Sequence, residues 1–185
     1  KFYDKALRVN PASYDAWFNL SHLYSVEGET NNAVSALRIC QKIRPKDGDT
    51  EYFLSLALMR TKDYDKGLKY FEKRLCKETA FAVQNKTYPN KVRHDNLWHG
   101  ENIKDKTILV YYEAGFGDVI MFARYFPLLA QRCKKLIFKS QQQLSPFFKD
   151  NPHLGIDEII DTFIPEDSID FDVHCPLLSL PYLLG

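Results

Sequence analysis

Apolar residues in the first part of the chain recur at the spacing of an α-helix. Trp17, Leu20 and Tyr24 lie at i, i+3 and i+7, which places them on one helical face. The turn residues Glu27 and Gly28 follow. A second helical stripe then contains Ala33, Leu37 and Cys40, and Pro45 lies just past it. The pattern predicts a helix–turn–helix unit, because a proline is tolerated beyond a helix end but not inside one.

The same pattern recurs with a period of 34 residues. One period downstream, the equivalent positions are apolar or small: Leu54, Ser55, Leu58, Gly67 and Phe71. One period upstream they are Tyr3, Ala6 and Pro11. Glu51 replaces Trp17, which breaks the pattern, and no proline stands at Thr79. Residues 1–81 therefore resemble the tetratricopeptide family, with two repeats and the last helix of an earlier one. Because the pattern starts within a repeat, we expect a fragment of a longer protein.

This resemblance implies a binding face on the repeats. In the tetratricopeptide family, the concave face made by the first helix of each pair holds peptides or partner segments. On this chain that face would use Asn19, His22 and Tyr52, so we expect a protein or peptide partner there. The alternative is a spacer or a homodimerisation arm, since each repeat must in any case stack on its neighbours to bury its apolar side.

Residues 82–106 lose this periodicity and read as a connection between domains. The stretch is polar and is interrupted by Pro89 and Gly100. A structureless segment of this length is unusual inside a compact domain. We expect Trp98 to pack as an anchor, because a large indole is more often buried than exposed as a ligand platform.

Residues 107–185 alternate β-branched runs with amphipathic runs. Strands are predicted at 107–112, 135–140, 156–160 and 171–175, and a short helix at 144–149. Between the first two strands, a helix is expected to start near Asp118 and to kink or end at Pro127. Its predicted buried side consists of Ile120, Phe122, Ala123, Phe126 and Leu129. The alternation predicts a partial Rossmann-like parallel sheet with helices on both faces.

Residues capable of chemistry are expected at the carboxyl ends of these strands, where open α/β sheets bind ligands. Glu113, Gly115, Gly117 and Asp118 follow the first strand, and His174 is expected after the fourth. We therefore expect substrate-binding residues at Glu113, Gly115, Gly117 and His174. A nucleotide fingerprint fails here, because Ile120 replaces its third small residue and no G-K-[ST] follows. Asp118 could cap its helix, or it could also face a ligand as a general base.

Two longer segments carry a more specific resemblance. "ILVYYEAGFGDVIMFARYFPLL", "FDVHCPLLSLPYLLG" and the W-x-G at Trp98 and Gly100 resemble bacterial proteins that fuse tetratricopeptide repeats to a glycosyltransferase-like domain. "GFGDVI" with Pro127 also resembles the loop of the heptosyltransferases, which have the two-domain GT-B fold. The resemblance implies that Asp118 is a catalytic base near the acceptor and that Gly117 shapes the loop. It assigns no role to His174.

The GT-B resemblance also sets the expected cofactors. A nucleotide-sugar donor would be held largely by a second domain beyond Gly185, so we expect the fragment itself to be inactive. No metal is expected in the chemistry. The rival hypothesis is a non-catalytic tetratricopeptide scaffold that mediates protein–protein interaction.

Composition and charge narrow the function classes. The chain is 45% hydrophobic and 26% charged with a formal net charge of +1, which offers no electrostatic case for nucleic acid or an anionic membrane. No apolar run reaches the roughly 18 residues of a membrane span. Cys40, Cys76, Cys133 and Cys175 form no C-x-x-C pair, which fits a reducing, cytoplasmic setting without a zinc site. Cys40 and Cys76 are expected to be buried thiols.

Overall fold

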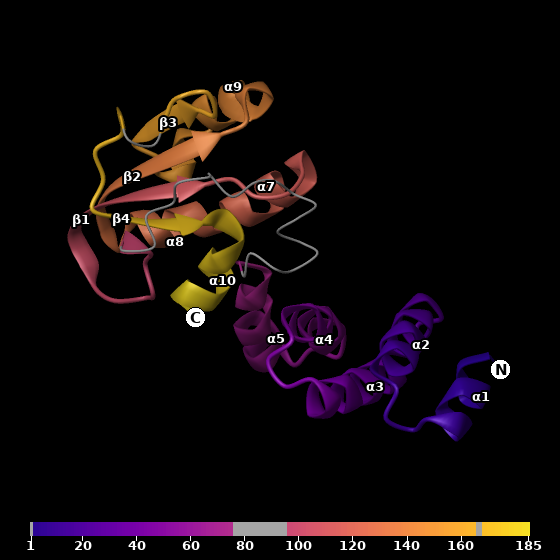
Figure 1. Ribbon diagram of the computed structural model, residues 1–185. Helices are drawn as coiled ribbons and strands as arrows, with labels where there is room; N and C mark the ends of the chain where they lie inside the picture. The colour runs from indigo at the N-terminus through magenta and orange to yellow at the C-terminus, as the bar shows by residue number, and fades with distance from the viewer. Residues whose placement is uncertain (1, 76–95, 166–167) are drawn as a thin grey trace. The chain divides into compact units, whose positions relative to one another are not determined.

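The computed structural model describes residues 2–75, 96–165 and 168–185, and the chain divides into two compact units, Lys1–Gln84 and Asn85–Gly185 (Figure 1). Cys76 and the junction at residue 81 lie outside the described residues. The predicted domain limits at 81 and 106 therefore stay a prediction. The predicted order, helical repeats followed by a parallel α/β sheet, is confirmed.

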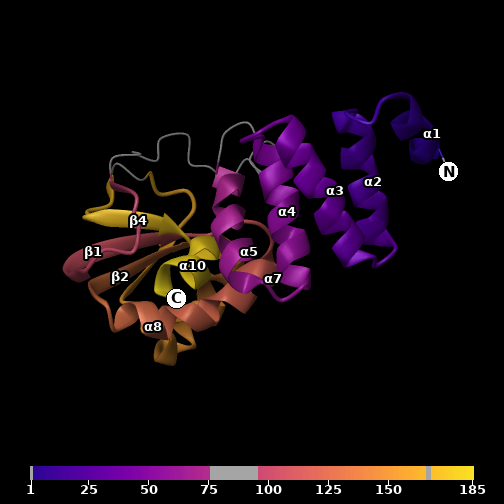
Figure 2. The ribbon, with the colours of Figure 1, turned by 90° about the horizontal axis from the view of Figure 1, so that it is seen from below.

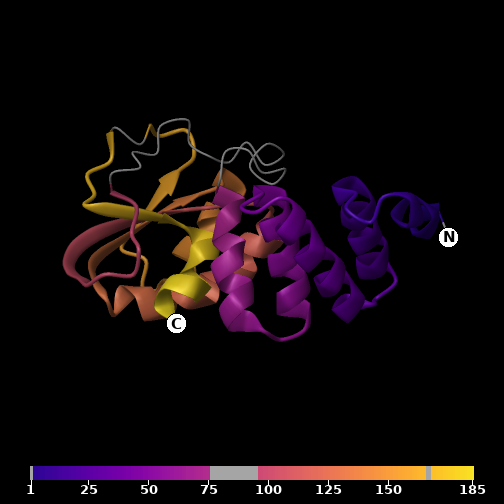
Figure 3. The same ribbon diagram turned by 60° about the horizontal axis from the view of Figure 1, so that its bottom comes forward.

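The first unit is a row of antiparallel helices. Its described part consists of α1 (Phe2–Val9), α2 (Tyr14–Val26), α3 (Thr30–Ile43), α4 (Gly48–Arg60), α5 (Tyr64–Phe71) and a 3-10 turn, η1 (Glu72–Leu75). Figure 2 shows these helices side by side in chain order, and Figure 3 shows the same pairs from another side. Each helix packs on the next, as expected for repeats that cannot bury their apolar faces alone.

The 34-residue period is visible in the core of this unit. Leu54 and Ser55, one period after Leu20 and Ser21, are fully buried in α4. At the crossing of α4 and α5, a Cβ on Gly67 would lie 2.6 Å from Met59 Cγ. Small residues are therefore needed where paired helices approach, as predicted.

Glu51, which replaces the repeat's tryptophan, is buried and forms an ion pair with Lys73 at 3.5 Å. Cys40 is fully buried, and this burial raises the pKa of its thiol to about 11, as expected of an inert thiol.

Adjacent repeats are joined by a polar contact around Tyr14. Its hydroxyl donates to Asp47 Oδ2 at 2.8 Å and lies 2.9 Å from Thr50 Oγ1. Asp47 also caps α4 by accepting from the backbone N–H of Thr50 at 2.8 Å. The Arg44 guanidinium lies 3.8 Å from the centre of the Tyr14 ring. This cluster ties the start of α2 to the start of α4.

Burial is the largest single influence on the pKa values of Tyr14 and Asp47. Burial raises the pKa of Tyr14 to about 12. Burial would also raise the pKa of Asp47, but hydrogen bonds from Thr50 and Tyr14 outweigh it and hold that pKa below its ordinary value. A depressed carboxyl pKa stabilises the fold above the unfolded-state pKa, and this contribution is lost as pH falls through the folded-state pKa.

We expect Asp47→Ala to lower the free energy of unfolding of the repeat unit by about 0.5–2 kcal/mol at pH 7. The deficit should begin to shrink below about pH 4, where the unfolded chain takes up the proton, and should be lost as pH falls through the lower pKa of folded Asp47. Urea unfolding followed by circular dichroism at pH 7, 5 and 3 measures this. Asp15→Ala is the matched control, because Asp15 lies in the first turn of α2 and is exposed. A deficit that does not change with pH would contradict the assignment.

The second unit contains a four-stranded parallel sheet in the order β3-β2-β1-β4. The strands are β1 (Ile103–Tyr111), β2 (Cys133–Ser140), β3 (Glu158–Asp161) and β4 (Val173–Pro176). The connecting elements are α7 (Phe116–Phe122), η3 (Ala123–Tyr125), α8 (Phe126–Ala130), η4 (Gln142–Leu144), α9 (Ser145–Lys149) and η5 (Pro152–Leu154). After β4 come η7 (Leu177–Ser179) and α10 (Leu180–Leu184). Pro127 lies in the first turn of α8, where it starts a new helix after the 3-10 turn.

The two faces of the sheet are covered differently. On one face, Phe138 of β2 packs between Phe126 of α8 and Phe148 of α9, with ring centroids 4.8 and 4.9 Å away. Neighbouring residues of a strand point to opposite faces, so Ile137 lies on the other face. There it clusters with Leu109 and Ile160. The partly buried residues packed on that cluster, Ile169 and Phe171, come from the loop between β3 and β4. Among the described residues, those packed on this cluster come from that loop and not from a helix.

Two local expectations need correction. β1 begins at Ile103 rather than at 107. Its register shifts between Ile103 and Thr107, which interrupts the alternation of apolar and polar residues by which a strand is predicted. The helix after β1 begins at Phe116, two residues before the expected start at Asp118. Val119 is therefore buried, while Ile120, which the sequence placed on the buried side, is 46% exposed.

In the ranges that the structure describes, no helix is both long and apolar enough to cross a membrane.

Candidate functional site

The loop between β1 and α7 stands at the carboxyl edge of the sheet. β1 ends at Tyr111 and α7 begins at Phe116. The left-handed residue of this loop is Ala114, at φ 60°, and neither glycine has a positive φ. A Cβ on Gly117 would meet no atom within 4 Å, so this glycine leaves open space at the surface. Gly115 and Gly117 are both exposed beside Asp118. The arrangement gives a ligand access to the loop backbone.

Asp118 closes this loop from within the helix. It is the third residue of α7, and its Oδ2 accepts the backbone N–H of Gly115 at 3.2 Å. Gly115 has no side chain to return the bond, so this is only the carboxylate half of a capping box. Asp118 is half-buried, and its Oδ1 accepts no hydrogen bond from the residues that the structure describes. The carboxylate therefore caps the helix through one oxygen and leaves the other available.

Glu113 lies inside the fold rather than at the open edge. It is buried, and its Oε2 accepts the backbone N–H of Leu178 at 3.2 Å. This bond ties the loop after β1 to η7, the element after β4. Glu113 thus positions the loop that carries Asp118, and its expected contact with a substrate stays a prediction.

His174 is not at the carboxyl end of β4, where the sequence placed it. It is the second residue of that strand, pairs in register with Leu109 and is buried. Its ring centroid lies 5.8 Å from that of Tyr111 and 6.0 Å from that of Phe171. The apolar run continues through β4 into η7, so hydrophobicity alone gave no signal for the strand end. A substrate role for His174 stays a prediction.

Gln141 is a residue of this edge that the sequence reasoning missed. It directly follows β2, and its Nε2 donates to the carbonyl of Ala114 at 3.4 Å. The signal was available, because Gln141 is the polar residue after a buried strand and the carboxyl ends of parallel strands share one edge. The structure thus brings Gly115, Gly117, Asp118 and Gln141 together.

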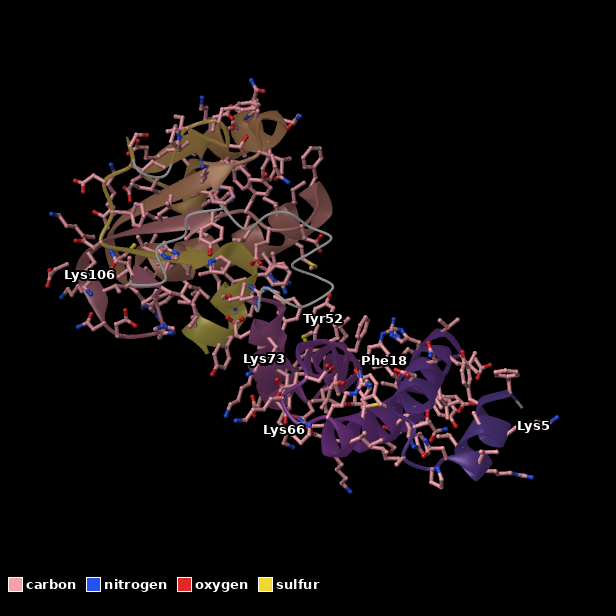
Figure 4. The ribbon with its side chains drawn as sticks, viewed as in Figure 1. Lys5, Phe18, Tyr52, Lys66, Lys73 and Lys106 are labelled. Atoms are coloured by element: carbon pink, nitrogen blue, oxygen red, sulfur yellow. The ribbon has the colours of Figure 1, made fainter. Side chains whose placement is uncertain are left out.

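A second candidate site lies on the repeats. His22 of α2 lies between Phe18 and Phe53, with ring centroids 5.0 and 4.4 Å away, and Tyr52 continues the row 5.3 Å from Phe53. We call Phe18, His22, Tyr52 and Phe53 the aromatic row; all four are half-buried. Figure 4 shows Phe18 on α2 and Tyr52 on α4. The row joins the first helices of two successive repeats.

Of the three residues predicted for this face, His22 and Tyr52 belong to the row. Asn19 is exposed, and its amide donates to the carbonyl of Asp15 on its own helix at 2.7 Å. Sequence reasoning missed Phe18 and Phe53. Both are partly buried against the core cluster of Leu37, Leu54, Ala57 and Leu58. Phe18 stands one period before Tyr52, and Phe53 stands one period after Asn19, which was the signal for them.

Within residues 2–75, 96–165 and 168–185, no group of three or more His, Cys, Asp or Glu side chains could hold a metal ion.

Comparison with known proteins gives a family match for the start of the first unit. Residues 2–35 match the family model of the tetratricopeptide repeat. The helix pair that follows in the described part of the unit, α4 with α5, repeats the pattern of α2 and α3 at the same 34-residue period. Over 75 residues, the chain is 31% identical to anaphase-promoting complex subunit 3 of Schizosaccharomyces pombe. That alignment covers 40% of this chain and 11% of the relative.

A solved structure of a mutant O-GlcNAc transferase from Thermobaculum terrenum is a distant match. It has 12% sequence identity and a TM-score of 0.37, and the match covers 87% of this chain and 37% of that one. The chain thus spans about a tenth of the curated relative and about a third of this solved chain.

Proposed function

We propose that the tetratricopeptide repeats bind an extended segment of a partner protein on the aromatic row. The supporting observation is a set of aromatic side chains, each only partly buried, on equivalent helices of two successive repeats. Aromatic side chains supply large contact area at small entropic cost and dominate the energetics of protein interfaces. A spacer would have no need to keep such rings accessible. Binding of a second copy of this chain at the row is the alternative.

A peptide display screen against the chain tests this proposal. We expect enriched peptides to bind the Phe18→Ala and Tyr52→Ala variants at least about 30-fold more weakly, the loss typical of an interface hot spot. Tyr64→Ala is the matched control, since Tyr64 is an exposed aromatic residue of α5 outside the row, and it should change affinity less than about twofold.

Affinities are measured by calorimetry on variants whose circular dichroism matches that of the wild type. Failure to enrich any peptide, or equal losses in all three variants, would contradict the proposal. Sedimentation of the unliganded chain decides the alternative, because a dimer that Tyr52→Ala dissociates would assign the row to self-association.

We propose further that the α/β unit forms the acceptor side of a glycosyltransferase when the chain is part of a longer protein. The supporting observation is Asp118 Oδ1, which stays available in an exposed glycine loop at the ligand-binding edge of a parallel sheet. A carboxylate oxygen in that position could accept the proton of an acceptor hydroxyl as the sugar is transferred. The nucleotide-sugar would be supplied by another domain, and a cytoplasmic setting belongs to the same proposal.

The non-catalytic scaffold is the rival to this second proposal. Both readings keep a partner on the repeats, but only the transferase needs Asp118. The Asp118→Asn variant of the full-length protein therefore separates them. Loss of turnover in Asp118→Asn with unchanged partner binding would support the transferase. Absence of turnover of any nucleotide-sugar in the wild-type protein, with partner binding intact, would favour the scaffold.

A further inference from the structure

The α/β unit contains a pocket at the end of the sheet opposite to the Asp118 loop. It has a volume of about 410 Å³ and lies where β1 begins and where α8 leads into β2. The buried side chains of Trp98 and Ile103 form its apolar part, and Lys104, Gln131 and Arg132 are exposed at its polar part. This volume is typical of small-molecule sites, and the lining mixes polar and apolar surface in similar proportions.

One wall of the pocket is held rigidly by local hydrogen bonds. The indole N–H of Trp98 donates to the carbonyl of Glu101 at 2.8 Å, and the backbone N–H of His99 donates to Glu101 Oε2 at 2.9 Å. Gly100 adopts φ +96°, a conformation that side chains disfavour. The wall is therefore already formed, so that a ligand would not have to order it.

The opposite wall presents an oriented guanidinium. Arg132 Nη2 donates to the carbonyl of Leu184 at 3.1 Å, and the backbone N–H of Arg132 donates to the carbonyl of Leu129 at 2.8 Å. A guanidinium has five N–H donors, and the described residues engage only this one. The other donors are available to a ligand in the pocket.

The charges of the lining favour an anion. Lys104 and Arg132 are cationic, and the lining contains a single carboxylate, that of Glu101. One oxygen of that carboxylate is already engaged by the backbone of His99. We propose that this pocket binds a compact anion, a small carboxylate or a phosphate, through Arg132 with Lys104 in support. Arginine suits this task because its planar fork can donate two parallel hydrogen bonds to such a group.

The two tryptophans of the chain provide a direct test. The indole N–H of Trp98 lies in the pocket wall, whereas that of Trp17 donates to the carbonyl of Pro11 in the repeat unit at 2.8 Å. Malonate or inorganic phosphate is titrated into the ¹⁵N-labelled chain at constant ionic strength. We expect the Trp98 indole resonance to shift with saturation below about 10 mM, and the Trp17 resonance to stay in place.

Variants identify the residues responsible. Arg132→Gln is expected to weaken anion binding at least about tenfold, because charge-assisted bidentate bonds are lost. Lys134→Gln, an equal charge change at an exposed position of β2 outside the pocket, should weaken it less than about twofold. If Arg132→Gln does not fold, the affinity of Lys104→Gln for the same anion is measured instead, and we expect it to be lower than that of the wild type.

A Trp98 shift that saturates with either anion supports the site. The anion that binds more tightly, malonate or phosphate, shows whether the ligand is a carboxylate or a phosphate. A linear, unsaturated shift, equal shifts of both indoles, or an unchanged affinity in both pocket variants would overturn the proposal. The result is independent of the transferase proposal, because the pocket lies at the other end of the sheet from Asp118.

Discussion

Asp118→Asn in the full-length protein is expected to lower kcat/KM for sugar transfer by about 10²- to 10⁴-fold, the usual contribution of a general base. Asparagine cannot take up the hydroxyl proton, but its side-chain oxygen can still accept the N–H of Gly115, as Asp118 Oδ2 does. The fold should therefore survive. Initial rates of transfer from a radiolabelled nucleotide-sugar measure the loss, and circular dichroism verifies the structure.

The control for this variant is Asp105→Asn. Asp105 is exposed near the start of β1, in the part of the strand where the register shifts. We expect it to change the rate less than about twofold. If Asp118 served only as a helix cap, its replacement would cost about 1 kcal/mol of stability and lower the melting temperature of the Asp118→Asn variant. The acid limb of the pH–rate profile would then remain, because the catalytic base would be another group. Undiminished turnover in Asp118→Asn would exclude Asp118 as the base.

Phe138→Ala should destabilise the α/β unit by about 3–5 kcal/mol. The Phe138 side chain is fully buried and makes ring contacts with Phe126 and Phe148, so its removal leaves a cavity and deletes two aromatic pairs. Because this loss is comparable to the total stability of many domains, the unit is expected to be largely unfolded at physiological temperature.

Trp98 fluorescence in a Trp17→Phe background measures this loss by urea unfolding, because Trp98 is buried in the same unit as Phe138. Phe147→Ala is the matched control. Phe147 precedes Phe148 in α9 and is 40% exposed, so its replacement should lower the free energy of unfolding by less than about 1 kcal/mol. Equal losses in the two variants would show that the aromatic cluster does not organise this core.

The repeats could be predicted from sequence because each apolar position is tested again one period later. Leu20 predicts Leu54, and small Ala33 predicts Gly67, whose missing side chain makes room for Met59. The start of β1 could not be found in this way. The register shift after Ile103 turns polar residues outward, which hides the strand from a test based on strict alternation.

The candidate site was only partly visible in the sequence. Asp118 follows a clear strand and a pair of glycines, so its place at the edge could be predicted. The interior position of His174 could not, because apolar residues flank it on both sides and continue from β4 into η7. Whether Glu113 turns inward depends on its bond with Leu178, far away in the chain, which no local pattern encodes.

The strand order also has a consequence for how the α/β unit assembles. Ile108 pairs with Leu136 on one side and with Val173 on the other, so the second pairing encloses more than twice as much chain as the first. By loop-closure entropy the longer closure costs about 0.7 kcal/mol more. β1 and β2 should therefore join early as the nucleus, and β4 should dock onto their free edge only after the intervening chain has collapsed.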